Sequence, residues 1–189
     1  MRNNQYTGTI HVCLGNLQNL QYLDFSNTLM TGTIPASLGK LQNLQFLDFS
    51  DTLMTGTIPA SLGKLQNCYI LLLHNAKFSG TLPPEIGNMT GMIEVSLANN
   101  NFNGTLPLEW GKLNKVKFIN LSGNDLTGSL PSEWESLAQV TEVDLSFNKL
   151  SGTLPQNWIA MQNLIALQLF NTSMTFDLAA MSWITEFRK

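Results

Sequence analysis

The sequence has little charge and little cysteine, and it has no long hydrophobic run. Only 12% of its 189 residues are charged, and 10 basic against 13 acidic residues leave a net charge of -3. We expect no nucleic-acid partner, because such binding needs a basic surface. The longest nearly pure apolar run, Cys68 to Leu73, is far shorter than the ~18 residues of a membrane-spanning helix, and the first five residues lack the apolar core of a signal peptide. We therefore expect no signal peptide and no membrane anchor in this chain.

The few residues with metal-binding or nucleophilic chemistry are scattered. Cys13 and Cys68 fall at different points of the repeat described below, so we expect two free thiols. His11 and His74 also occupy unlike positions, and neither has a serine, cysteine or carboxylate partner at a recognisable motif spacing. The sequence thus predicts no enzyme, no cofactor and no metal site.

What the sequence does have is internal repetition with a period of 24 residues. The segments 17–40 and 41–64 differ at only two positions. This register predicts a partial N-terminal unit over residues 1–16 and seven units over residues 17–184, the last of them degenerate. The seven units begin at Leu17, Leu41, Leu65, Met89, Leu113, Leu137 and Met161.

Each unit combines two kinds of spacing. Apolar side chains recur at positions 1, 4, 7, 9, 14, 18 and 22 of a unit, and positions 7 and 9 have the period of two that is typical of a strand. Glycine at position 16 and proline at position 19 then interrupt regular structure and turn the chain. Because no unit buries its own leucines, the units must stack with parallel strands into a curved α/β solenoid.

The consensus of these units resembles a known family. Residues 140–155 (VTEVDLSFNKLSGTLP) follow the pattern LxxLxLxxNxL followed by Thr/Ser-Gly-x-Ile/Leu-Pro, which is similar to the plant-type leucine-rich repeat. The resemblance implies a right-handed superhelix with a parallel sheet on the concave face and irregular or 3-10 turns on the convex face. It also implies an ectodomain at the cell surface or outside the cell. The endings LPLEW, LPSEW and LPQNW of units four to six further resemble surface-antigen repeats of trypanosomatid parasites.

One consensus position is only partly occupied. Asparagine stands at position 12 in Asn100, Asn124 and Asn148, where it would satisfy buried turn backbone. The other units replace it by Thr28, Thr52, Ala76 and Thr172. We therefore expect a complete asparagine ladder in the middle units and a looser stack in the first three.

The two ends of the stack differ. The chain starts inside a predicted strand, so we expect an uncapped N-terminal edge of the solenoid, through which two copies could self-associate. At the other end Asp177 precedes apolar residues three apart, at Leu178, Met181, Ile184 and Phe187. This spacing predicts a short capping helix within residues 177–189.

Candidate binding residues come from the alternation of the strands. Positions 6, 8 and 10 are expected to face outward from the sheet. Three apolar residues of position 6 and one of position 8 then form an exposed strip, and a second, aromatic group lies nearer the C-terminus. Ligand contact and cross-strand packing explain these residues equally well. The candidate ligand-binding residues are Tyr22, Phe46, Ile70, Leu72, Phe118, Phe147 and Phe170.

Other columns have structural as well as functional interpretations. Asp24 and Asp48 stack like a carboxylate pair, but the family consensus also favours aspartate there as a polar, solvated ladder. Trp110, Trp134 and Trp158 replace leucine or isoleucine at position 22, which favours packing between repeats over ligand contact. The nominal charges of the face sum to -5, which favours a partner with basic character. The charged residues counted are the acidic Asp24, Asp48, Asp51, Glu94, Asp125, Glu142 and Asp144 and the basic Lys77 and Lys149.

Together these features predict a non-catalytic module that recognises a protein or peptide through the concave sheet. Two alternatives stay open: a structural or antigenic array without a specialised face, and a fragment of a larger leucine-rich-repeat receptor. The near identity of the first two units favours the array. Glycosylation is not decided by the sequence, which has acceptor motifs at Asn88, Asn103, Asn120 and Asn171.

Overall fold

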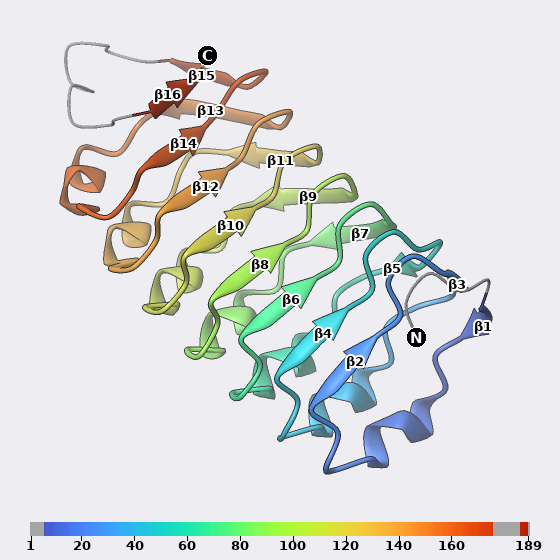
Figure 1. The fold of residues 1–189 in the computed structure, drawn as a ribbon. Helices are drawn as coiled ribbons and strands as arrows, with labels where there is room; N and C mark the ends of the chain where they lie inside the picture. The colour runs from blue at the N-terminus through green and yellow to red at the C-terminus, as the bar shows by residue number, and fades with distance from the viewer. Residues whose placement is uncertain (1–5, 176–185, 189) are drawn as a thin grey trace.

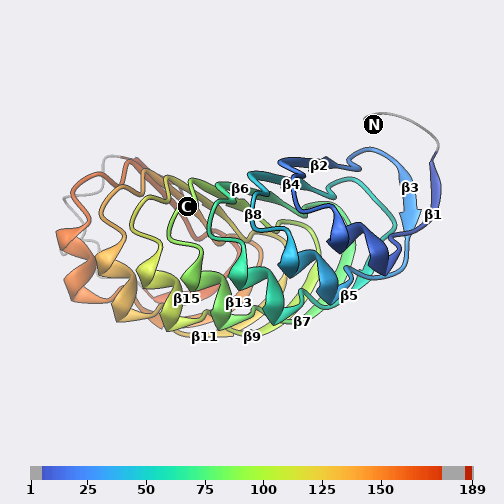
Figure 2. The same cartoon turned by 90° about the horizontal axis from the view of Figure 1, so that it is seen from below.

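The protein forms a curved solenoid in which each repeat makes one turn (Figure 1). The computed structural model describes residues 6–175 and 186–188. Successive turns lie side by side from the N-terminus to the C-terminus, so each repeat packs mainly on the repeats before and after it (Figures 1 and 2). The solenoid predicted from the repeats is confirmed.

The main sheet has eight parallel strands in sequence order, one from each turn. Partners are 24 residues apart in most of it, as Tyr22 and Phe46 are, so equivalent positions of neighbouring repeats form straight columns. The strands are β2 (Tyr22–Asp24), β4 (Phe46–Asp48), β6 (Ile70–Leu72), β8 (Glu94–Ser96), β10 (Phe118–Asn120), β12 (Glu142–Asp144), β14 (Ala166–Gln168) and β16 (Glu186–Arg188).

The return path of each repeat is more regular than predicted. A second set of short parallel strands follows the turn after the main sheet, and a 3-10 helix leads back to the next strand. The second strands are β1 (Thr7–Thr9), β3 (Leu29–Thr31), β5 (Thr55–Gly56), β7 (Lys77–Thr81), β9 (Asn101–Thr105), β11 (Asp125–Gly128), β13 (Lys149–Thr153) and β15 (Ser173–Thr175). The 3-10 helices are η1 (Val12–Asn16), η2 (Ala36–Lys40), η3 (Ala60–Lys64), η4 (Pro84–Asn88), η5 (Leu108–Lys112), η6 (Ser132–Ser136) and η7 (Gln156–Ala160).

The core consists of columns of equivalent apolar side chains. Most residues at positions 7 and 9 of the units are buried, as are the three tryptophans at position 22. Each large apolar side chain that is fully buried contributes about 1.5–3 kcal/mol, whereas an exposed ion pair contributes about 0–1 kcal/mol. These columns therefore dominate the stability of the stack.

The asparagine ladder occupies the turn between the two sheets. The amide nitrogen of Asn100 donates to the backbone carbonyl oxygens of Leu73, Leu97 and Ala98, and its side-chain oxygen accepts from Phe78 N at 3.0 Å. Asn124 and Asn148 repeat this arrangement. Each asparagine thus links its own repeat to the preceding one.

Threonine replaces the ladder asparagine in the first two complete units and makes fewer hydrogen bonds to the backbone. The hydroxyl groups of Thr28 and Thr52 donate to the carbonyl oxygens of Phe25 and Phe49 at 2.7 and 2.8 Å, within their own repeats. They satisfy the local turn without joining two units. The predicted looseness of the first three units stays a prediction.

The C-terminal segment departs from the predicted helix where it is described. Glu186–Arg188 forms β16, which pairs in parallel with β14. The helix predicted over residues 177–189 is therefore wrong for these three residues. Its remaining part, including Leu178, Met181 and Ile184, lies outside the described residues.

Candidate functional site

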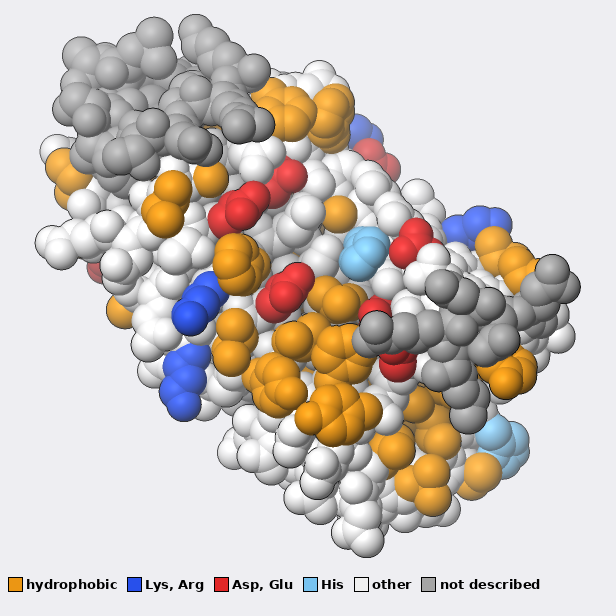
Figure 3. Space-filling view, in the orientation of Figure 1, with side chains coloured by type: hydrophobic (Ala, Val, Ile, Leu, Met, Phe, Trp, Pro, Cys, Tyr) orange, Lys and Arg blue, Asp and Glu red, His pale blue; other side chains and the backbone are white. Residues whose placement is uncertain are grey.

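The outward face of the main sheet holds a group of apolar side chains, which we call the apolar strip: Tyr22, Phe46, Ile70 and Leu72. The first three are direct partners on β2, β4 and β6, and the Tyr22 and Phe46 rings lie 6.4 Å apart. Tyr22 is 59% exposed and the other three are half-buried. The space-filling view shows a hydrophobic group over these strands (Figure 3). The structure thus brings these predicted residues together.

Tyr69 borders the strip and was missed by the sequence analysis. It is half-buried one residue before β6, and a hydrogen bond with the Tyr22 side chain raises the pKa of its phenol. The Tyr22 hydroxyl also donates to Oε1 of Gln45 at 3.3 Å. Position 5 of the repeat lies outside the strict alternation of the strand, so alternation gives no signal for it.

The second aromatic group divides into two places. Phe147 and Phe170 form an edge-to-face pair with centroids 5.0 Å apart, and Phe147 is 52% exposed. Phe118 instead stands at the start of β10, where its direct partners are Glu94 and Glu142. The structure therefore groups Phe147 with Phe170 and places Phe118 between two carboxylates.

A shallow hollow of about 180 Å³ lies beside Phe118 on the same face. It combines one exposed aromatic ring with acidic and amide groups from three neighbouring strands. The lining residues are Glu94, Val95, Ser96, Phe118, Ile119, Asn120, Glu142 and Asp144. Such a lining suits a basic or aromatic side chain of a ligand.

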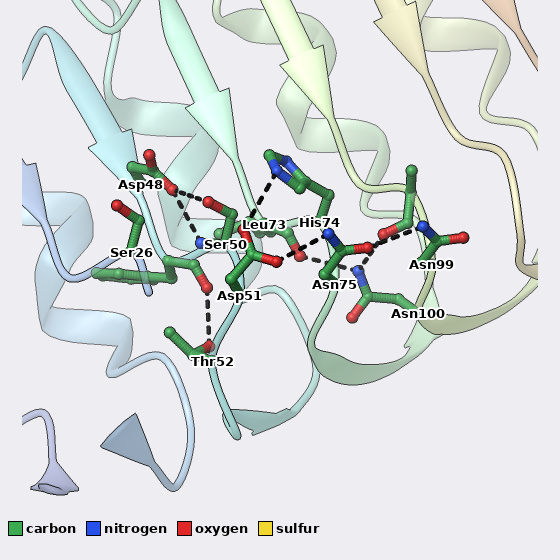
Figure 4. Close-up of polar contacts among 12 residues, drawn as sticks. Ser26, Asp48, Ser50, Asp51, Thr52, Leu73, His74, Asn75, Asn99 and Asn100 are labelled. Atoms are coloured by element: carbon green, nitrogen blue, oxygen red, sulfur yellow. Dashed lines mark hydrogen bonds and ion pairs between the residues drawn. The ribbon is translucent and has the colours of Figure 1, made fainter. Parts of the chain in front are cut away.

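The aspartates at position 8 are engaged in their own turns. Oδ1 of Asp48 accepts the Ser50 backbone N–H at 2.9 Å and the Ser50 hydroxyl at 2.6 Å, and Asp48 is only 6% exposed (Figure 4). Asp24 binds Ser26 in the same way. These aspartates therefore hold the turn that follows their strand, and the expectation of a solvated ladder is wrong for Asp48.

The outward orientation predicted for position 10 is wrong for three of its four serines; the fourth, Ser122, is half-buried. Ser26, Ser50 and Ser146 are 4%, 3% and 1% exposed. The strand ends at position 8, and each serine folds back onto the aspartate two residues before it, so the alternation of the strand no longer applies at position 10.

A polar row at position 11 borders the sheet. Asn99 donates to Asn75 at 2.8 Å, and Asn75 donates to Asp51 at 2.9 Å, while Nε2 of His74 lies 3.8 Å from Oδ2 of Asp51 (Figure 4). Residues 51, 75 and 99 all have a positive φ of 54°, which asparagine and aspartate tolerate better than most residues. The cross-repeat carboxylate beside His74 was not predicted, because it becomes adjacent only when repeats stack.

Chemically reactive groups lie apart from the strip. Nδ1 of His11 lies 2.9 Å from Sγ of Cys13, and it also accepts the Cys13 backbone N–H, so this histidine caps η1. Within residues 6–175 and 186–188, no three His, Cys, Asp or Glu residues are arranged to hold a metal ion.

The two cysteines should react very differently. Both are free thiols, as predicted; Cys13 is exposed, whereas burial raises the pKa of the Cys68 thiol to about 12. Because the thiolate is the reactive form, an alkylating reagent at pH 8 should modify Cys13 and spare Cys68 in the native protein. Mass spectrometry should find one adduct per native chain and two after denaturation. Rapid double modification of the native chain would contradict the burial of Cys68.

The tryptophan column belongs to the interior. Trp110, Trp134 and Trp158 are fully buried, with stacked rings whose centroids are 6.3 and 6.2 Å apart. Their indole nitrogens donate to the carbonyl oxygens of prolines in the preceding repeats. The predicted packing role is confirmed, and no tryptophan of this column is exposed for ligand contact.

Stacked parallel strands, 3-10 returns and an asparagine ladder together define a leucine-rich-repeat protein. A family model described as "Leucine-rich repeat region" matches residues 2–185. The chain belongs to this family. No curated protein sequence matches the chain.

The solved structures similar to this chain include plant receptor ectodomains. The ectodomain of the receptor kinase GASSHO1/SCHENGEN3 from Arabidopsis thaliana, in complex with CASPARIAN STRIP INTEGRITY FACTOR 2, is 36% identical with a TM-score of 0.88. The HAESA ectodomain from Arabidopsis, in complex with an IDA peptide hormone, is 30% identical with a TM-score of 0.86. The alignments cover 92% of this chain but only 21% and 30% of those receptor chains.

A third similar structure is a TDR receptor, which is 28% identical with a TM-score of 0.89 over 91% of this chain and 30% of that one. This chain therefore spans less than a third of each of these three receptor chains. In the part that the structure describes, no helix has the length and apolar character needed to cross a membrane.

Proposed function

We propose that this protein is a non-catalytic recognition module that binds a peptide or an extended protein segment on the outward face of its main sheet. The module lies outside the cell or at the cell surface in this proposal, as a part of a larger receptor-like protein. The apolar strip carries the proposal: Tyr22 is 59% exposed beside Phe46 on strands whose backbone is paired within the sheet. Exposed aromatic groups on a rigid surface are typical of binding sites.

The rigidity of the strands supports this function energetically. Each inner strand of the main sheet is hydrogen-bonded to a neighbour on both sides, and its inward side chains are buried. A ligand therefore meets side chains whose backbone is already ordered, which lowers the entropy lost on binding. The similar receptor ectodomains crystallised with peptide or protein ligands support a ligand of the same class.

The charge of the face favours a basic ligand. Glu94 and Glu142 flank Phe118, and the carboxylates of Asp48 and Asp144 at position 8 accept hydrogen bonds from the serines that follow them. Lys149 pairs with Asp125 at 2.7 Å, but these two residues begin β13 and β11 among the second strands and do not belong to the main sheet. Peptide binding should weaken as salt rises, because the screening length falls to about 3 Å at 1 M ionic strength.

The proposal predicts which substitutions abolish binding. A random-peptide library selected on the wild-type chain provides the ligand, and calorimetry measures its dissociation constant. The double variant Tyr22→Ala/Phe46→Ala should bind about tenfold or more weakly, because truncation of a central aromatic anchor costs about 2 kcal/mol or more. The triple variant Phe118→Ala/Phe147→Ala/Phe170→Ala tests the second group in the same way.

Ile159→Ala is the matched control. Ile159 is 58% exposed but belongs to η7, away from the main sheet. The control should bind like the wild type, and all variants should keep their circular dichroism spectrum and melting temperature. Unchanged affinity in both aromatic variants would contradict the assignment of the face.

A structural or antigenic array is the second candidate. It is favoured by the near identity of residues 17–40 and 41–64, because a specialised face usually differs from unit to unit. If the library yields no peptide that binds the main sheet, this second candidate replaces the first.

A further inference from the structure

A second regular surface lies on the other strands and is not used by the proposed ligand site. The second strands carry two columns of short polar side chains, at positions 15 and 17 of the repeat, which we call the hydroxyl columns. Position 15 is occupied by Thr7, Thr31, Thr55, Ser79, Asn103, Thr127, Ser151 and Thr175. Position 17 is occupied by Thr9, Thr33, Thr57, Thr81, Thr105, Ser129 and Thr153.

The composition of these columns is not explained by the fold. The family pattern asks for Thr or Ser at position 15 but leaves position 17, between the glycine and the buried Ile or Leu, unspecified. This chain nevertheless has threonine or serine at position 17 in every unit from Thr9 to Thr153, and none of the residues named in the two columns is charged; Asp177 takes this position in the degenerate last unit and lies outside the described residues. The residues from Thr9 to Thr153 at position 17 are all exposed, so burial in the core does not demand this choice.

The threonines of position 15 are held by hydrogen bonds between repeats. The hydroxyl of Thr31 donates to the carbonyl oxygen of Gly8 at 3.2 Å, and that of Thr55 donates to Gly32 at 3.4 Å. Thr127 and Thr175 make the same contact at 3.2 Å. Each donated proton fixes the side-chain rotamer and leaves the lone pairs of the oxygen toward solvent.

The threonines of position 17 are held by their methyl groups. A Cβ atom on Gly56 would lie 2.7 Å from Cγ2 of Thr33, and one on Gly80 would lie 2.8 Å from Cγ2 of Thr57. Both glycines also have a φ near 80°, so only glycine fits there. The methyl group thus packs over the glycine of the next repeat and directs the hydroxyl outward.

The two columns join into one lattice because the second strands pair with an offset. Thr9 is the direct partner of Thr31, Thr105 of Thr127, and Thr153 of Thr175. Position 17 of one repeat therefore stands beside position 15 of the next, and the rows recur at the ~4.8 Å strand spacing. The ribbon in Figure 2 shows these strands following one another along one surface of the solenoid.

We propose that this surface binds ice. A lattice of fixed, uncharged hydroxyl and methyl groups matches a ligand that is itself a periodic array of water, since the strand spacing is close to the repeat of oxygen rows in ice. Charged side chains would hold their own hydration shells, and the described residues of the two columns have none; the charges on these strands, Lys77, Asp125 and Lys149, stand in the neighbouring position 13. Aromatic rings that stack on sugar rings are also missing from both columns, which disfavours a polysaccharide. Many weak contacts on a preorganised surface together give tight binding to ice.

The test is ice-affinity partition of the full chain, made in a bacterial host so that no glycan occupies Asn103. Ice is grown slowly from a dilute protein solution, and the ratio of protein in ice to protein in liquid is measured. The wild type should enrich in ice, and Thr81→Lys/Thr105→Lys in the middle of position 17 should reduce the ratio about tenfold or more, as expected when a charge must lose its water. Thr81→Val/Thr105→Val then separates the hydroxyl contribution from the methyl contribution.

Thr90→Lys is the matched control, because Thr90 is exposed outside both columns. It should partition like the wild type, and melting temperatures should show that all variants fold. Exclusion of the wild type from ice would overturn the proposal, as would an equal loss in Thr90→Lys. Capture of peptide by the main sheet is measured separately, so either site can fail without the other.

Discussion

Trp134→Ala should lower the free energy of unfolding by about 3–5 kcal/mol, as expected for removal of a large aromatic side chain from a core. Trp134 is fully buried between Trp110 and Trp158. Its indole nitrogen donates to the carbonyl oxygen of Pro107 at 2.9 Å. In the alanine variant this carbonyl oxygen would have no hydrogen-bond partner from the side chain at position 134. Urea denaturation followed by circular dichroism measures the change.

Trp134→Leu is the matched control for this prediction. Leu38 and Leu62 occupy the same column in the first two complete units and are fully buried there. Leucine therefore fits the column, and its cost should be clearly smaller than that of alanine. A loss in Trp134→Ala no larger than the ~0.5 kcal/mol of an ordinary surface substitution would contradict the role of the column.

Asn124→Ala should cost at least about 2 kcal/mol, because several buried backbone groups lose their partner and each costs about 1–3 kcal/mol. The Asn124 amide donates to Leu97 O and Leu121 O at 3.1 Å, and its oxygen accepts from Phe102 N at 3.0 Å. Leu97 and Phe102 belong to the preceding repeat, so the substitution also weakens the contact between two units. Urea denaturation gives the loss.

Thr52→Ala provides the comparison at the same repeat position. The Thr52 hydroxyl donates to Phe49 O at 2.8 Å and accepts a long hydrogen bond from Met54 N at 3.5 Å, both within its own unit, so its removal should cost about 1 kcal/mol. Asn124→Thr should fall between the two alanine variants, since threonine restores the local bond but not the bonds to the preceding repeat. Equal losses in Asn124→Ala and Thr52→Ala would show that the asparagine ladder does not join the units.

The sequence predicts well those features that the repeat period imposes. The buried residues of positions 7 and 9, the parallel stacking and the tryptophan column all come from apolar side chains that recur every 24 residues. These side chains are buried only when the repeats stack, so the pattern alone predicts the solenoid. The apolar strip on β2, β4 and β6 follows from the same register.

Features that depend on local turn geometry were not predictable in the same way. Alternation places Ser50 outward, but the strand ends at Asp48 and the serine folds back to donate to it. Most of the second strands contain the glycine of position 16, a residue that usually breaks regular structure, so the return path was expected to be irregular. Phe118 was grouped with Phe147 by type, whereas its strand position places it between Glu94 and Glu142.

The central claim is that ligand binds to the outward face of the main sheet, and hydroxyl-radical footprinting with the selected peptide tests it most directly. The peptide should protect the apolar strip, above all Tyr22 and Phe46, from oxidation. Leu108 and Ile159 are 52% and 58% exposed on 3-10 helices and should be oxidised equally with and without peptide. Protection of these two residues, with the strip still oxidised, would contradict the account.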